Sequence, residues 1–154
     1  MEQKTARRLG YWYYGMMVLA VLVATLAYMA VMRGWLQVTE PLSASGQVIQ
    51  YVVIFDVLLT VPIGLYGFSQ ACKRIREIED EAARHEAYYK WGIARIVLVS
   101  NAMVLGMGAF YLLGGYQPML FVAAIAAIGW YFTKPTVRKV EIELTQPAEG
   151  QETY

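Results

Sequence analysis

Four apolar stretches of the chain are long enough to cross a lipid bilayer as α-helices. They extend from about Tyr11 to Met32, Gln47 to Ser69, Tyr88 to Leu113 and Gln117 to Thr133. An α-helix needs about 17–25 residues to cross the hydrocarbon core of a membrane. The first and fourth stretches have no polar face at helical spacing, although a helix of a water-soluble bundle needs one on its outer side. The pattern therefore favours transmembrane helices over a soluble helical bundle.

The composition agrees with a membrane environment. Hydrophobic residues make up 58% of the 154 residues and charged residues only 16%, whereas a soluble domain is about 45–50% apolar. We expect an all-α, polytopic membrane protein with four transmembrane helices that form two antiparallel hairpins. The four-helix transmembrane domain would cover residues 1–136 and would contain a helical cytoplasmic link between the hairpins. A short cytoplasmic tail would cover residues 137–154.

The basic residues of the short loops lie almost entirely on one side of this arrangement. Eleven of the 13 Lys and Arg residues fall in the N-terminal segment, the central link and the tail, whereas the opposite side has only Arg33. The eleven are Lys4, Arg7, Arg8, Lys73, Arg74, Arg76, Arg84, Lys90, Lys134, Arg138 and Lys139. Because cytoplasmic loops carry the excess of positive charge, we expect both termini in the cytoplasm. The expected location is a plasma membrane, in particular a bacterial inner membrane.

The link and the tail have different patterns. The link Lys73–Lys90 contains no Gly or Pro and places opposite charges four residues apart, as at Glu86 and Lys90, so we expect a helix. It is either a docking helix for a soluble partner or a solvated extension of the neighbouring spans. The tail segment Val137–Leu144 alternates apolar and charged residues from Lys139 onward. This period predicts either a strand that needs a partner strand or a membrane surface, or an unstructured tail.

Polar side chains within the apolar stretches are the candidate functional residues, since a charge at the bilayer centre costs about 2.5–3.5 kcal/mol. They are Asp56 and Thr60 in the second stretch and Arg95 and Asn101 in the third. At about 1.5 Å per residue, Asp56 and Asn101 lie about 20 Å and Arg95 about 10 Å from the cytoplasmic ends. Arg95 can then extend toward Asp56 and Thr60 or turn toward the cytoplasmic interface.

Two interpretations of these four residues stay open. In the functional one, they form an intramembrane polar centre in which Asp56 accepts a proton or a cation and Arg95 is its counter-charge or contacts an anion. Asn101 and Thr60 are then hydrogen-bonding neighbours. In the structural one, a buried ion pair or hydrogen-bond set fixes how the helices pack, and Arg95 is merely interfacial.

The residues that several enzyme classes need are missing from the sequence. The single cysteine, Cys72, excludes an intrachain disulfide and an internal CxxC pair, and the single histidine, His85, cannot build a histidine metal cluster. The chain has neither an HExxH motif nor a glycine-rich phosphate loop. We therefore expect no enzymatic activity, no cofactor and no metal site.

The net charge of +1 favours no polyanionic partner, and we expect no nucleic-acid binding. The expected partners are the lipid bilayer and either a second copy of the chain or a larger membrane complex. The leading hypothesis is a non-enzymatic subunit or scaffold of a membrane complex. The alternative is a small oligomeric transporter or channel that uses Asp56, Arg95 and Asn101.

Overall fold

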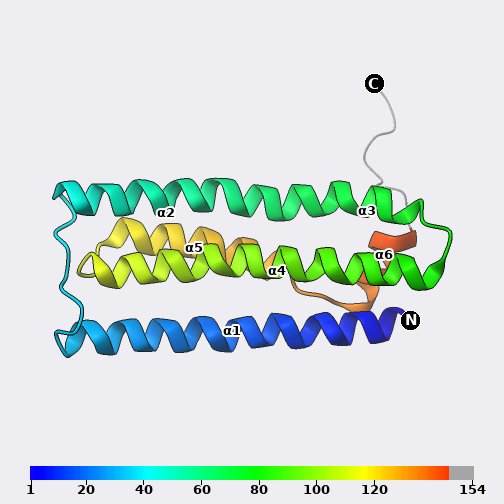
Figure 1. Cartoon of the computed structure of the whole chain (residues 1–154), viewed down its shortest axis with the longest axis horizontal. Helices are drawn as coiled ribbons and strands as arrows, with labels where there is room; N and C mark the ends of the chain where they lie inside the picture. Colours follow the sequence, from blue (N-terminus) through cyan, green and yellow to red (C-terminus); the bar gives the residue numbers. More distant parts are fainter. Residues whose placement is uncertain (146–154) are drawn as a thin grey trace, which may run out of the picture.

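The structure, a computed structural model, describes residues 1–145, and every regular element in that range is a helix. The elements are α1 (Glu2–Met32), α2 (Ala44–Pro62), the π-helical turn η1 (Ile63–Gly67), α3 (Phe68–Arg76), α4 (Glu81–Leu112), α5 (Gln117–Phe132) and α6 (Val137–Thr145). The long helices lie side by side, and the short α6 lies at the end of the bundle where α1 begins (Figure 1). The all-helical class is thus confirmed for the described part of the chain.

Three helices are long and apolar enough to cross a membrane. They are α1, the helix Ala44–Arg76 that joins α2, η1 and α3, and α4. The 16 residues of α5 contribute a fourth candidate when α5 is taken together with α6, to which it is bent by 74°. The structure therefore has three to four candidate spans, which fits a helical membrane protein.

Helix α4 is the central element, because it packs against α1, α2, α3 and α5. Glycines allow these close approaches. A Cβ atom on Gly92 would lie 2.8 Å from a methyl carbon of Leu9 in α1, and one on Gly106 would lie 3.0 Å from the backbone of Ala123 in α5. Small residues at a helix crossing bring two backbones together and increase their van der Waals contact.

The link between α3 and α4 is helical only in part. The expected continuous helix over residues 73–90 is interrupted at residues 77–80, because α3 and α4 pack against each other and the chain must reverse direction between them. Asp80 immediately precedes α4, and its carboxylate accepts hydrogen bonds from the backbone N–H groups of Ala82 and Ala83, both at 3.2 Å. This is an N-terminal helix cap. The predicted ion pair between Glu86 and Lys90 is present at 3.8 Å.

The tail segment forms a helix, so both expectations for it, a strand or an unstructured tail, are wrong over residues 137–144. In α6, Val140 and Leu144 lie one turn apart and are 0% and 4% exposed. They join a core cluster with Ala6 of α1 and Ile75 of α3. Helical spacing places both apolar side chains in this cluster, whereas a strand would need a partner to pair its backbone.

The close crossing of α4 and α5 gives a first prediction. Gly106→Leu is expected to lower the unfolding temperature in mild detergent, measured by intrinsic tryptophan fluorescence, because the added side chain meets the backbone of α5. Overpacking of this kind costs about 1–3 kcal/mol. Gly108→Leu is the matched control, since a Cβ atom there meets nothing within 4 Å. Equal unfolding temperatures for the two variants would contradict the crossing.

Candidate functional site

The structure brings two of the four predicted site residues together. Thr60 Oγ1 donates a hydrogen bond to the backbone carbonyl of Asp56, one turn earlier in α2, at 2.6 Å. The Asp56 Oδ2 atom is buried and has no hydrogen-bond partner among residues 1–145. Within the same range, the ion pair found for Arg95 is with another carboxylate, not with Asp56. Asp56 and Thr60 therefore meet through the backbone of one helix.

Asn101 lies on an exposed face of α4. Its neighbours on this face, Val97 and Leu105, are each four residues away and are 38% and 40% exposed. The side chains that α4 buries against the other helices, such as Val99 and Ala102, lie on its remaining surface. Asn101 is thus an amide on the outer surface of the bundle, within an otherwise apolar stripe.

Arg95 is buried and turns toward the end of the bundle where α6 lies. Its side chain is 5% exposed, and Nη1 lies 3.7 Å from Oε1 of Glu143 in α6. Nη2 donates to the Thr133 carbonyl at 3.4 Å, and the guanidinium lies over the Phe68 ring, 3.7 Å from its centroid. The sequence left two directions open for Arg95, toward Asp56 and Thr60 or toward the end of the helix. In the structure the side chain points away from Asp56 and contacts Glu143.

Glu143 is the centre of a set of side chains that we call the charged cluster: Arg76, Tyr88, Arg95, Lys139 and Glu143. The hydroxyl of Tyr88 donates to Glu143 Oε2 at 2.5 Å, and Arg76 Nε donates to the backbone carbonyl of Glu143 at 2.7 Å. Helices α3 and α4 thereby hold α6 by charge-assisted hydrogen bonds, which are the stronger class of hydrogen bond.

Lys139 is the member of the charged cluster whose pKa is shifted. Burial, followed by repulsion from Arg95, lowers the pKa of Lys139. The nearby Cys72 is a buried side chain, 3% exposed.

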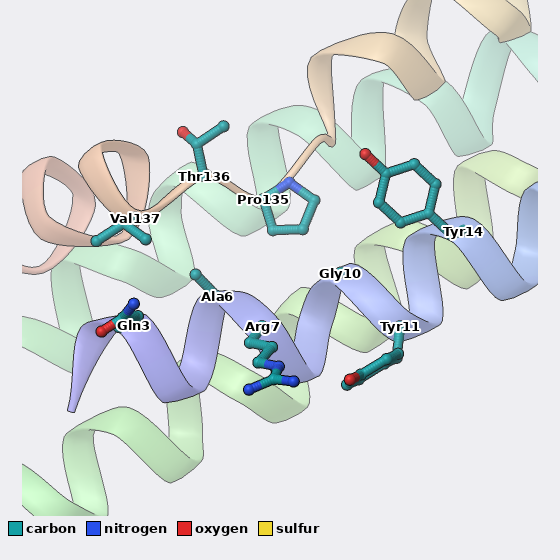
Figure 2. Close-up of a pocket in the computed structure, with 9 residues that line it drawn as sticks. All are labelled: Gln3, Ala6, Arg7, Gly10, Tyr11, Tyr14, Pro135, Thr136 and Val137. Carbon is teal, nitrogen blue, oxygen red and sulfur yellow. The ribbon is translucent and has the colours of Figure 1, made fainter.

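Two of the hollows at this end of the bundle lie beside α6. The first, of about 230 Å³, is lined by the charged cluster without Tyr88 and by Cys72. The second, of about 450 Å³, lies between α1 and the connection from α5 to α6. Figure 2 shows the second hollow, where Arg7 and Tyr11 point to the side of α1 opposite Pro135. Only the first hollow combines several cations with a carboxylate.

Sequence reasoning missed Glu143, Tyr88, Arg76 and Lys139 as partners of Arg95. One signal was available, because a buried arginine requires a carboxylate and no second acid occurs in the apolar stretches. The tail supplies one when it is helical, since Lys139 and Glu143 are then one turn apart. The period-two pattern concealed this spacing.

Comparison of the chain with protein-family models, with curated proteins and with solved structures finds no match of any of the three kinds. Among residues 1–145, no three His, Cys, Asp or Glu side chains lie close enough together to hold a metal ion. The chemistry of the site therefore follows from the charged cluster, the outward amide of Asn101 and the buried oxygen of Asp56 alone.

Glu143 is predicted to fasten α6 to the bundle. Glu143→Ala removes the carboxylate that faces Arg95 and Tyr88, and it should lower the free energy that keeps α6 docked by about 3 kcal/mol. Hydrogen–deuterium exchange of residues 137–145 should then accelerate strongly. Glu141→Ala is the control, because Glu141 is an exposed residue of the same helix. Unchanged exchange in Glu143→Ala would show that the carboxylate does not hold the helix.

Proposed function

We propose that the chain is a four-span protein of a plasma membrane, of the bacterial inner-membrane type, with both termini in the cytoplasm. The helices Glu2–Met32, Ala44–Arg76 and Glu81–Leu112 support three spans by length and hydropathy. The 16 residues of α5 would extend about 24 Å, which a bilayer accommodates by local thinning. The one-sided distribution of Lys and Arg supports the orientation.

Within this membrane, the protein acts as a non-enzymatic subunit or scaffold that associates laterally with a membrane partner or a second copy. The observation that carries this proposal is the exposed amide of Asn101. No side-chain hydrogen bond joins it to another residue of the described chain, and its face of α4 is otherwise apolar. Hydrocarbon offers an amide no hydrogen-bond partner, so a neighbouring helix that supplies one is favoured.

A second exposed face is compatible with the same proposal. The buried residues of α1 all lie in its first twenty positions, and the last of them is Ala20. Beyond this point, the described structure leaves α1 with exposed apolar side chains, such as Leu22 and Leu26, which are 50% and 52% exposed. Such a surface is compatible with lipid and with another helix, so it permits lateral association.

The alternative function, a small oligomeric transporter or channel, draws support from one observation. Asp56 Oδ2 is buried without a hydrogen-bond partner among residues 1–145, and a carboxylate in that position attracts a proton or a cation. Arg95 is engaged with Glu143 and Asn101 faces outward. In one copy of the chain, Asp56 would therefore act without them, which makes this the weaker candidate.

Replacing Asn101 is predicted to weaken the lateral association. Asn101→Leu keeps the branched shape of the side chain and removes its amide, and interhelical hydrogen bonds of this kind contribute about 0.6–2 kcal/mol. We expect about a threefold to thirtyfold weaker association, measured by energy transfer between labelled copies, or by co-purification with the partner, in mild detergent. Thr25→Val is the control, because the Thr25 hydroxyl is already bonded to the Val21 carbonyl of its own helix at 2.8 Å.

The same preparations separate the two functions. If Asp56→Asn leaves association intact and abolishes ion flux that the wild-type protein shows in proteoliposomes, the transporter is favoured and the scaffold is rejected. If no variant changes flux and only Asn101→Leu impairs association, the scaffold stands. If Asn101→Leu, Thr25→Val and the wild type associate equally, the Asn101 amide does not contribute to association.

The orientation predicts which introduced cysteines react with an impermeant maleimide in intact cells or spheroplasts. Leu42→Cys, in the connection between α1 and α2, should be labelled from outside, and Ala83→Cys should be labelled only after the membrane is permeabilised. Leu42 is 78% exposed and Cys72 is 3% exposed, so the natural thiol should not contribute. The reverse pattern would invert the topology.

A further inference from the structure

The hollow beside the charged cluster has two chemically different sides. Leu65, Phe68 and Phe132 form an apolar side, and Lys73, Arg76 and Lys139 form a cationic side. The cationic residues come later than the apolar ones along both chain segments, so they lie farther from the apolar stretches. The hollow of about 230 Å³ thus changes from apolar to cationic toward the end of the bundle.

The charges around this hollow do not balance. Four cationic side chains line it, those of Lys73, Arg76, Arg95 and Lys139, against the single carboxylate of Glu143. That carboxylate is already shared between Tyr88 and Arg95. Burial and Arg95 lower the pKa of Lys139, which is the effect expected where positive charges lie close together without enough counter-charge.

Arg95 also has hydrogen-bonding capacity left over. The side chain is 5% exposed, it lines the hollow, and its Nε atom is buried without a partner among the described residues. A buried N–H group of a charged side chain without a partner is costly and uncommon. An anion in the hollow would neutralise part of the excess charge and would give the guanidinium a further acceptor.

From these observations we propose that the hollow between α3, α5 and α6 binds an anionic phosphate group, namely that of a phospholipid headgroup. Arg76, Arg95 and Lys139 would surround the phosphate oxygens, and Lys73 would contact it from the exposed rim. Arginine and lysine are the usual partners of phosphate in proteins, and arginine offers it paired N–H donors.

The apolar side of the hollow favours a lipid over free inorganic phosphate. Phe132 is 58% exposed, and together with Leu65 it would contact the glycerol and upper acyl region of a bound lipid. Basic pockets on the cytoplasmic side of membrane helices are a recognised form of anionic lipid site. This inference rests on the proposed membrane location, because the headgroup must lie level with the cytoplasmic ends of the helices.

The test measures lipid binding to the full-length protein in a neutral detergent. Phosphatidylglycerol, phosphatidylcholine and inorganic phosphate are titrated at constant ionic strength, and binding is followed by the unfolding temperature and by native mass spectrometry. We expect phosphatidylglycerol to raise the unfolding temperature and to remain bound as a single molecule. Phosphatidylcholine, whose phosphate is paired with a choline cation, and inorganic phosphate should each bind at least about tenfold more weakly.

A matched pair of variants connects this binding to the hollow. Lys73→Gln combined with Lys139→Gln should weaken phosphatidylglycerol binding at least about tenfold. Arg74→Gln combined with Lys134→Gln removes the same charge from residues that do not line the hollow, and it should change binding less than about twofold. If the first double variant does not fold, Lys73→Gln alone is used, because Lys73 is an exposed residue of the rim.

Three outcomes would overturn the proposal. Equal binding of phosphatidylglycerol and phosphatidylcholine would remove the preference for an anionic headgroup. If inorganic phosphate binds as tightly as phosphatidylglycerol, the ligand is phosphate and not a lipid. If both double variants weaken binding equally, the lipid is attracted by the overall positive charge and not by the hollow. Maleimide labelling and the association measurements test the proposed function separately. If they give the expected results while lipid binding does not, only the lipid site is rejected.

Discussion

The close approach of other helices to α4 is the constraint on which the rest of the structure depends. Gly92 admits Leu9 of α1, and Gly106 admits the backbone of α5 at Ala123. Because α4 is the common neighbour of α1, α2, α3 and α5, these two positions set how closely α1 and α5 approach the central helix. Van der Waals contact between small residues is also the principal attraction available to helices in hydrocarbon. The same contacts are therefore compatible with a bundle that lipid surrounds.

The buried Arg95 imposes the second constraint, and it explains why the end of the chain becomes part of the bundle. An arginine that is 5% exposed requires an acceptor, and Glu143 supplies it from α6. To bring Glu143 there, the segment after Thr133 turns back over α3 and α1, and burial of Val140 and Leu144 contributes apolar contact. One charge inside an apolar helix thus favours the docked conformation of a segment that is distant in the sequence.

The sequence predicts the elements whose signals are long and local, and it fails where the decisive contact is distant. Uninterrupted hydropathy located the long helices, and the all-helical class followed from it. The prediction for the tail was wrong because eight residues with a period of two can also form a helix that buries Val140 and Leu144. Only tertiary contact decides between a strand and a helix here. The direction of Arg95 could not be read for the same reason, since its partner lies in that tail. Asp56, Thr60 and Asn101 stay predicted functional residues. Asp56 and Thr60 lie one turn apart in α2, whereas Asn101 lies on an exposed face of α4.

This separation has a consequence for how the proposed activities relate to each other. Asn101 lies on an outer face of α4 among Val97 and Leu105, whereas the hollow lined by Arg95 and Lys139 opens between α3, α5 and α6. Asn101 itself is not one of the residues that line this hollow. Two sites without shared residues are expected to contribute independently to stability, except through the rigid helix that carries both. Since Asn101 and Arg95 belong to the same α4, any coupling between association and lipid binding must pass along that helix. Replacing one residue should otherwise leave the affinity of the other site unchanged.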